Sequence, residues 1–298
     1  MEVRPLHEVF AAELIGADLA QDPDAALVQT VEEAMTRYAV VVVRDQTHVG
    51  DDEHIRFSRA FGPLELPPSL GFKTSGNRRF RWELYDASNL DVDGNIEAAD
   101  TLKRRYSKGN EQFHTDSSFN DLPTKWSLLF CHIATPERGE TEFVDTRAAY
   151  DRLSDAMKSR VDGLIVEHNV WRSRERAGFT DTDPLKKALP AVRHPLVRES
   201  ASGRKALYIG SHADHIVDMP LDEGRALLDE LTAIATEAKF VYAHKWRNGD
   251  LVIWDNRCTL HRATEFDYLS HKRDLRRTTI NEYGEERAAN EGLRATAA

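Results

Sequence analysis

The first candidate for chemistry in the sequence is a pair of ionisable side chains, His114 and Asp116, with one residue between them. If this stretch is extended, residues i and i+2 leave the same face of the backbone, so both side chains can reach one ion while Thr115 points away. An imidazole and a carboxylate suit a borderline divalent metal, and a third ligand would complete a two-His, one-carboxylate site with three open coordination positions. By spacing alone, a surface or hydrogen-bonded His and Asp is the commoner explanation of such a pair.

A second block, near the end of the chain, makes the pattern specific. Residues 249–262 read GDLVIWDNRCTLHR and contain His261, and residues 272–279 read KRDLRRTT. Together with residues 111–119, these blocks resemble the Fe(II)/2-oxoglutarate-dependent dioxygenases of the taurine dioxygenase and 2,4-dichlorophenoxyacetate dioxygenase family, and the likeness is closer to the 2,4-dichlorophenoxyacetate branch. The resemblance extends to residues 57–65 (FSRAFGPLE), 139–143 (GETEF), 202–205 (SGRK) and 209–213 (IGSHA).

The resemblance implies a metal centre in which His114, Asp116 and His261 hold Fe(II). In such a centre Fe(II) and O2 couple the decarboxylation of 2-oxoglutarate to the hydroxylation of a nearby C–H bond, and the protein supplies binding, orientation and shielding. The alternative for His261 is a core histidine that follows a buried strand. The WDNR sequence ahead of it and the arginines behind it favour the ligand.

The distal carboxylate of 2-oxoglutarate needs a planar, two-pronged donor, which Arg supplies and Lys does not. Arg273 matches the co-substrate arginine of the family. Its spacing from His261 is one residue longer than usual, which keeps the neighbouring Lys272 as an alternative, and counting back from residues 277–279 favours Arg273. Thr141 matches the family threonine that helps to hold the same co-substrate, and its alternative is a strand threonine bonded to backbone.

Strand parity predicts a second arginine in the same cavity. If residues 272–280 are extended, Arg273 and Arg277 share one face of the strand. Two buried guanidinium groups without anions would be costly, so we expect 2-oxoglutarate at Arg273 and an anionic small-molecule substrate at Arg277. The alternative is that an internal Asp or Glu pairs with Arg277.

Two long, irregular segments, near residues 67–109 and 172–190, are predicted to form loops over the active site. Lys73 and Lys108 lie in the first segment and are candidate substrate contacts, with solvated surface lysines as the alternative. His212 lies in one of the family-like blocks and is a further candidate substrate contact.

The composition limits the remaining possibilities. The 298 residues are 41% hydrophobic and 30% charged, which is typical of a globular protein, and we expect one domain over residues 1–298 with a frayed tail at about 285–298. A net charge of −10 opposes binding to nucleic acid or to anionic membranes. Two isolated cysteines, no signal segment and no apolar run of spanning length predict a cytoplasmic protein. We also expect a homo-oligomer.

The elements that must position these residues follow from hydrophobic periodicity and turn signals. Many short strands with few helices predict a mainly β fold with flanking helices, and the resemblance implies a double-stranded β-helix (jelly roll, cupin-like) core. An Asn-Gly turn within residues 247–250 predicts a hairpin between the two strands that flank it. Helices are predicted over residues 22–38, 51–61, 148–161 and 221–238, and strands over residues 39–44, 126–133, 141–144, 164–171, 207–209, 240–246 and 251–254.

For function, the resemblance implies hydroxylation of the carbon beside the ether oxygen of an aryloxyacetate such as 2,4-dichlorophenoxyacetate, which gives a phenol, glyoxylate, succinate and CO2. The aromatic residues of segment 67–109 offer a phenoxy ring an apolar surface. A taurine or other sulfonate dioxygenase with the same mechanism is the alternative. A non-catalytic metal-binding cupin or a zinc hydrolase is more remote, because a zinc hydrolase needs a general base but no second arginine.

Overall fold

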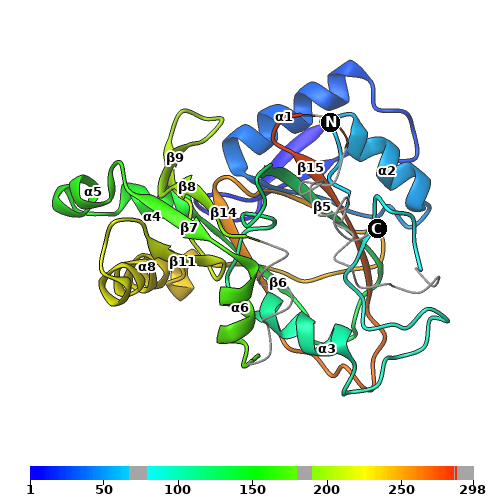
Figure 1. Cartoon of the computed structure of the whole chain (residues 1–298). Coiled ribbons are helices and arrows are strands. Elements are labelled where there is room, and N and C mark those ends of the chain that lie inside the picture. The colour runs from blue at the N-terminus through cyan, green and yellow to red at the C-terminus, as the bar shows by residue number, and fades with distance from the viewer. Residues whose placement is uncertain (67–78, 180–189, 285, 287–298) are drawn as a thin grey trace.

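A seven-stranded sheet forms the larger half of the fold (Figure 1). The computed structural model describes residues 1–66, 79–179, 190–284 and 286 of the chain. The sheet has the strand order β1-β2-β3-β13-β5-β15-β4, in which β2 and β3 are parallel and all other neighbours are antiparallel. Its strands are β1 (Glu2–Pro5), β2 (Ala12–Ile15), β3 (Val40–Val43), β4 (Tyr85–Asp86), β5 (Thr124–Ile133), β13 (Leu251–Asp255) and β15 (Asp274–Asn281).

Three smaller antiparallel sheets complete the β structure. The one that faces the large sheet has the order β12-β6-β14, and its Phe143 ring lies 5.5 Å, centroid to centroid, from the Trp254 ring of β13. The other two have the orders β11-β7-β8 and β10-β9. Their strands are β6 (Thr141–Asp145), β7 (Ile165–His168), β8 (Val192–Pro195), β9 (Val197–Glu199), β10 (Lys205–Leu207), β11 (Ala213–Ile216), β12 (Tyr242–His244) and β14 (Thr259–Ala263).

Helices flank this β core, as predicted. Figure 1 shows α1 and α2 packed along the outer face of the large sheet, while α3 and α6 lie near each other at the opposite side. No described helix is long and apolar enough to cross a membrane. The helices are α1 (Ala25–Tyr38), α2 (Asp51–Arg59), α3 (Leu102–Ser107), α4 (Thr146–Asp151), α5 (Asp155–Val161), α6 (Val170–Arg176) and α8 (Leu221–Ala235), with 3-10 turns η1 (Lys108–Glu111) and η2 (Ala238–Phe240).

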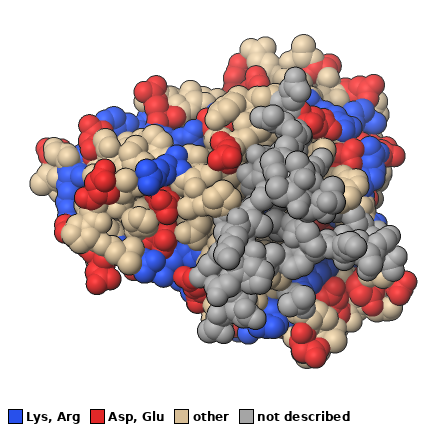
Figure 2. Space-filling view, in the orientation of Figure 1, with Lys and Arg blue, Asp and Glu red and all other residues tan. Residues whose placement is uncertain are grey.

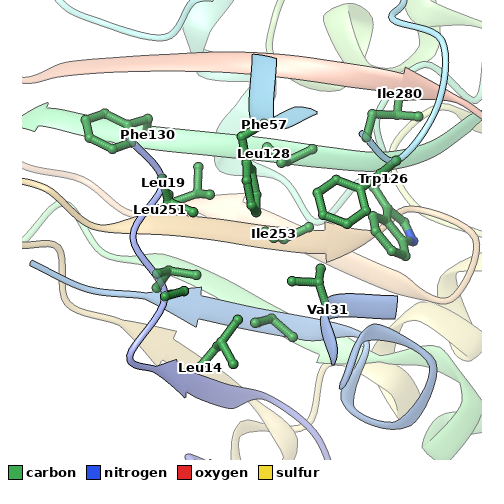
Figure 3. Close-up of a cluster of buried hydrophobic side chains, with 14 of the residues drawn as sticks. Leu14, Leu19, Val31, Phe57, Trp126, Leu128, Phe130, Leu251, Ile253 and Ile280 are labelled. Atoms are coloured by element: carbon green, nitrogen blue, oxygen red, sulfur yellow. The ribbon is translucent and has the colours of Figure 1, made fainter. Parts of the chain in front are cut away.

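Alternate residues of the central strands face two different cores. Val41 and Val43 of β3 join the core beneath α1 and α2, which Figure 3 shows in close-up. Val40 and Val42 join a second core with Trp254 of β13, on the side of the small sheet. Strands that are buried on both faces read as continuous apolar runs. This explains why the β-branched run at residues 39–44 predicted its strand correctly.

Two predicted elements were wrong where a capping residue intervenes. The helix predicted over residues 148–161 is two helices, α4 and α5, because Ser154 accepts the N–H of Met157 at 3.2 Å and so begins α5. The strand predicted over residues 164–171 ends at His168. Asn169 then accepts the N–H of Arg172 at 2.8 Å and begins α6.

The predicted hairpin across residues 247–250 was also wrong. Strand β12 pairs with β6, whereas β13 pairs with β3 and β5, so the Asn-Gly link connects two sheets. Gly249 has a φ of 83°. Its N–H donates to Cys131 and its carbonyl oxygen accepts from Gln46, both at 2.8 Å. A Cβ on Gly249 would lie 2.6 Å from the backbone nitrogen of Thr47, so only glycine fits this crossing.

Candidate metal centre and active site

The three candidate metal ligands meet because the backbone pairs at the ligands themselves. His114 and His261 form an isolated antiparallel bridge, in which the N–H of His114 donates to the carbonyl oxygen of His261 at 3.0 Å and the reverse bond is 2.8 Å. Together with Asp116, these buried residues place one ligand atom each within 4.8 Å of one another. The structure therefore brings together the triad that the sequence singled out.

The protonation of the two imidazoles favours metal binding. The Nδ1–H of His114 donates to the carbonyl oxygen of Gln112 at 2.7 Å, which leaves Nε2 with its lone pair, 4.0 Å from Oδ1 of Asp116. Burial lowers the pKa of His114 and of His261, so both rings are held in the neutral form that ligates metal. Two neutral imidazoles and a carboxylate are a donor set that fits Fe(II).

Asn256 and Ser127 fix the orientation of Asp116. The Ser127 hydroxyl donates to Oδ2 of Asp116 at 2.7 Å, and the Asn256 amide nitrogen donates to the Ser127 oxygen at 2.9 Å. The amide oxygen of Asn256 accepts the backbone N–H of Asp116 and the indole N–H of Trp254, both at 3.0 Å. Hydrogen bonds of this kind hold a ligating carboxylate in one position before the metal arrives.

Glu65 supports the turn that follows Asp116. Ser117 has a φ of 52°, which lies in the left-handed region that non-glycine residues rarely adopt. Its hydroxyl donates to Oε1 of Glu65 at 2.9 Å, and the Thr124 hydroxyl donates to Oε2 at 3.1 Å. These bonds offset the backbone strain beside the metal ligand. Burial raises the pKa of Glu65.

Arg277 and Asp116 form an ion pair across the site. Burial alone would raise the pKa of Asp116, but the positive charge of Arg277 outweighs burial and leaves this pKa below its usual range. Asp116 is therefore the internal carboxylate partner of Arg277 that the sequence kept as an alternative. Arg277 still lines the cavity, and its buried Nε has no hydrogen-bond partner among the described residues.

Arg273 is a buried cation without a carboxylate partner in the described chain. It is 7% exposed, and its guanidinium donates only to the carbonyl oxygens of Ala87 at 3.4 Å and Gly139 at 3.3 Å. Burial lowers its pKa. Thr141 also lines the cavity, and its hydroxyl oxygen accepts the indole N–H of Trp246 at 3.0 Å. Its hydroxyl proton is therefore available to a ligand.

Unlike Arg273 and Arg277, the described lysine candidates do not line the cavity. Lys272 is exposed and donates to the carbonyl oxygen of Gly94 at 2.7 Å, so the structure favours Arg273 over this alternative. Lys108 is exposed on η1 and does not line the cavity. The prediction of a substrate contact for Lys108 is therefore corrected, because its side chain faces solvent. Lys73 lies outside the described residues.

His212 lies against the metal triad. Its ring is 5.7 Å from the ring of His114 and 4.9 Å from that of Phe119, both edge-on. Its Nδ1 lies 3.1 Å from the carbonyl oxygen of Thr115 and donates to it. Burial lowers the pKa of His212 well below its usual value, so a neutral ring faces the cavity.

A cavity of about 710 Å³ lies over these residues. The structure describes residues 79–109 of the predicted loop 67–109, and they supply much of the cavity wall. Residues 67–78 and 180–189 of the two predicted loops lie outside the described residues. Residue 285 and the tail from 287 onward also lie outside them. Segment 172–190 is helical in α6 as far as Arg176. The aromatic residues of the wall are Phe80, Tyr85, Tyr106, Phe119, Trp171, Trp254, Phe266 and Tyr268.

A metal face with open positions, placed beside a buried cation that a bound anion can neutralise, is the arrangement of an oxygenase that consumes an oxo acid. The sequence agrees with this class. The model of the family described as taurine catabolism dioxygenase TauD, TfdA family matches residues 2–279, and the chain belongs to this family.

Two individual relatives are similar to this chain over most of its length. The alpha-ketoglutarate-dependent 2,4-dichlorophenoxyacetate dioxygenase of Cupriavidus pinatubonensis (strain JMP 134 / LMG 1197) is 42% identical over 280 residues, which are 92% of this chain and 96% of that protein. The (S)-phenoxypropionate/alpha-ketoglutarate-dioxygenase of Sphingobium herbicidovorans is 33% identical and covers 91% of this chain and 92% of its own length.

Solved structures agree on the fold. The crystal structure of AAD-2 in complex with Mn(II) and N-oxalylglycine is 38% identical, with a TM-score of 0.88 over 96% of this chain and 99% of that one. A taurine dioxygenase from Burkholderia xenovorans has 30% identity and a TM-score of 0.74 over 94% of this chain and 90% of that one. The predicted jelly-roll core and the dependence on Fe(II), 2-oxoglutarate and O2 are confirmed.

Several supporting residues escaped the sequence analysis. Glu65 and Asn256 lay in blocks that carry the family resemblance, but nothing in the sequence shows that Asn256 bonds to Asp116 or that Glu65 bonds to the turn after it. Arg174 lay in a segment interpreted as a loop. Its signal was available, because an Asn that caps a helix three residues before Arg172 would have placed Arg174 on a helix.

Proposed function

We propose that this protein hydroxylates the carbon beside the ether oxygen of an aryloxyacetate such as 2,4-dichlorophenoxyacetate. The observation that supports this most strongly is the cavity itself, whose wall combines aromatic rings with arginines directly over the His-Asp-His triad. An aryl ring and a carboxylate on one small molecule would match both kinds of wall. The names of the relatives from Cupriavidus and Sphingobium point to the same class of substrate.

We assign the metal to His114, Asp116 and His261, and the co-substrate to Arg273 and Thr141. When bound, Fe(II) supplies the oxidising chemistry that links loss of CO2 from 2-oxoglutarate to hydroxylation of a C–H bond. The guanidinium of Arg273 can hold the distal carboxylate through two parallel hydrogen bonds. The hydroxyl of Thr141 can donate a third hydrogen bond to this carboxylate. Its oxygen already accepts the indole N–H of Trp246, so its proton is free for the co-substrate.

The same wall would orient the substrate. Arg277 lines the cavity and keeps a free Nε donor, which supports a contact with the anionic end of the substrate. His212 and Phe119 border the metal triad, where the ether carbon must lie. Hydroxylation turns that carbon into a hemiacetal, whose bond to the aryl oxygen breaks while the hydroxyl proton passes to the phenolate. The products are a phenol and glyoxylate.

A substrate panel tests this function against the sulfonate alternative. Enzyme supplied with Fe(II), ascorbate and 2-oxoglutarate is given 2,4-dichlorophenoxyacetate or taurine at matched concentrations, and phenol, sulfite and succinate are measured. We expect phenol from the first substrate and little sulfite from the second, since taurine has two carbons and an ammonium that cannot use the aromatic wall. Sulfite production that exceeds phenol release would overturn the aryloxyacetate assignment.

The molecular surface supports a small-molecule substrate. The net charge is −10, and Figure 2 shows acidic and basic side chains interspersed on the visible face. The described part of this face offers no basic stripe to a nucleic acid or an anionic lipid. We propose that the protein works in the cytoplasm as a single-domain subunit of a homo-oligomer. Light scattering of the purified protein measures its mass in solution. A mass equal to that of one chain would contradict the homo-oligomer.

A further inference from the structure

One face of α6 forms part of the cavity wall. Val170, Trp171 and Arg174 all line the cavity, and residues three and four apart share one side of a helix. The neighbouring Arg176 points elsewhere, since it pairs with Asp229 of α8 at 2.5 Å. The wall contributed by α6 therefore presents an aromatic ring next to a guanidinium.

The cations that line the cavity differ in whether a carboxylate accompanies them. Among the described residues, Arg273 and Arg174 have no Asp or Glu oxygen within 4.0 Å. The other cations of the wall each have at least one such partner: Arg79, Lys103, Arg104 and Arg277. The proposed function assigns an anion to Arg273, the distal carboxylate of 2-oxoglutarate, but none to Arg174.

The contacts of Arg174 hold its guanidinium in place without neutralising it. Its Nη1 donates to the carbonyl oxygen of Tyr106 at 2.8 Å, and its Cζ lies 5.2 Å from the centre of the Tyr106 ring. The group also rests directly on Gly109, where a Cβ would lie only 1.9 Å from Nη1. Burial lowers the pKa of Arg174. A half-buried cation held in this way is stabilised by a carboxylate from outside the chain.

We propose that Arg174 binds the anionic group of the primary substrate, together with Arg277. This inference rests on the proposed function and identifies a binding residue that the family-like blocks do not contain. Arg277 alone is a weak anion site, because its ion pair with Asp116 is neutral overall. Arg174 supplies the uncompensated positive charge of the wall, and Trp171 beside it supplies an apolar surface for the ring.

Arg174 lines the same cavity as His212 and the three residues of the His-Asp-His triad. A substrate anchored there by its carboxylate would place the adjacent ether carbon over the metal face.

A purely structural role for Arg174 would give different results. If the side chain only joins α6 to α3 through Tyr106, its removal should weaken binding of charged and neutral ligands alike. Two variants separate the possibilities. Arg174→Gln removes the charge, whereas Gly109→Ala keeps the charge and displaces it, because the new Cβ would overlap Nη1. Arg176→Gln is the matched control on the same helix.

Calorimetry on the protein loaded with Mn(II) and N-oxalylglycine measures the effect without turnover. The ligands are 2,4-dichlorophenoxyacetate and its neutral amide, and taurine is included as the sulfonate. We expect Arg174→Gln to raise the Kd of the acid by about thirty-fold or more while the Kd of the amide changes little. Gly109→Ala should raise the Kd of the acid as well. Arg176→Gln should bind both ligands as the wild type does, and all variants should bind N-oxalylglycine alike.

Equal losses for acid and amide, or an unchanged Kd of the acid in Arg174→Gln and Gly109→Ala, would overturn the role of Arg174 and leave the proposed function standing. If the wild type binds taurine and not the acid, the aryloxyacetate function fails, and Arg174 is judged by the effect of the same variants on taurine. If neither anion binds, both proposals are overturned. Should Arg174→Gln not fold, Gly109→Ala and Arg174→Lys decide by the same comparison of acid and amide.

Discussion

The two faces of the seven-stranded sheet differ in what their side chains do. The face beneath α1 and α2 is filled by apolar residues, and there Arg276 pairs with Asp51 of α2 at 2.7 Å. On the opposite face the next residue of the same strand, Arg277, pairs with Asp116 at the metal triad. Because side chains alternate along a strand, one strand contributes to stability and to chemistry through neighbouring residues. The comparison predicts that substitutions on the two faces have separable effects.

The largest expected effect is on the cavity side, at the metal triad. His261→Ala should reduce turnover by more than about a hundredfold, since a ligand contributes more than the partners that orient it. The thermal midpoint of the metal-free protein should stay near that of the wild type, because the apolar core beneath α1 and α2 is untouched. Activity assays and calorimetry check both parts. Retained activity in the metal-reconstituted variant would remove His261 from the triad.

The next effect concerns the unpaired cation of the co-substrate site. Arg273→Ala should raise the KM for 2-oxoglutarate by a factor that corresponds to about 2–5 kcal/mol, because it removes one partner of a desolvated charge pair. Steady-state kinetics with varied 2-oxoglutarate measure this. Lys272→Ala is the control and should behave as the wild type, since Lys272 is exposed. A larger effect in the control would move the role to Lys272.

Neighbouring arginines of β15 provide the sharpest comparison of the two faces. Arg277→Ala should lower kcat/KM for the aryloxyacetate by about thirty-fold, which corresponds to about 2 kcal/mol, and leave the KM for 2-oxoglutarate nearly unchanged. Arg276→Ala should instead lower the free energy of unfolding and keep the KM for both substrates. If the two variants show the same kinetic defect, the separation of faces is wrong.

A smaller, pH-dependent effect is expected on the helix-covered face. Burial, followed by the charge of His132, lowers the pKa of His54 from 6.5 to about 3, so the unfolded chain binds a proton between these values that the folded chain does not. Stability should therefore fall as the pH drops below about 6.5, by up to about 1.4 kcal/mol per unit from this group. Urea unfolding of His54→Gln at several pH values should show a shallower loss than the wild type.

The sequence predicted the parts of this protein that depend on local pattern and strand parity. The buried run at 39–44, the amphipathic helices near 22–38 and 221–238, and the shared face of Arg273 and Arg277 are all present. Parity could not decide what accompanies Arg277, because its partner Asp116 is distant in sequence. That contact depends on how the chain closes around the metal triad.

Other features were missed because capping and long-range bonds decide them. Val170 and Trp171 extend the apolar run of β7, so periodicity alone continued the strand, whereas the Asn169 cap begins α6. This wrong prediction affected the active site, because α6 places Arg174 in the cavity wall. The bonds that join Glu65 to Ser117 likewise connect distant segments, and no local pattern indicates them.

The most direct test of the central proposal is the ratio of phenol to succinate formed from 2,4-dichlorophenoxyacetate by the wild-type enzyme. Coupled hydroxylation predicts one phenol per succinate over the time course, with both products absent when Fe(II) or 2-oxoglutarate is omitted. Succinate without phenol, at a rate that the aryloxyacetate does not change, would contradict the assignment of this compound as the substrate.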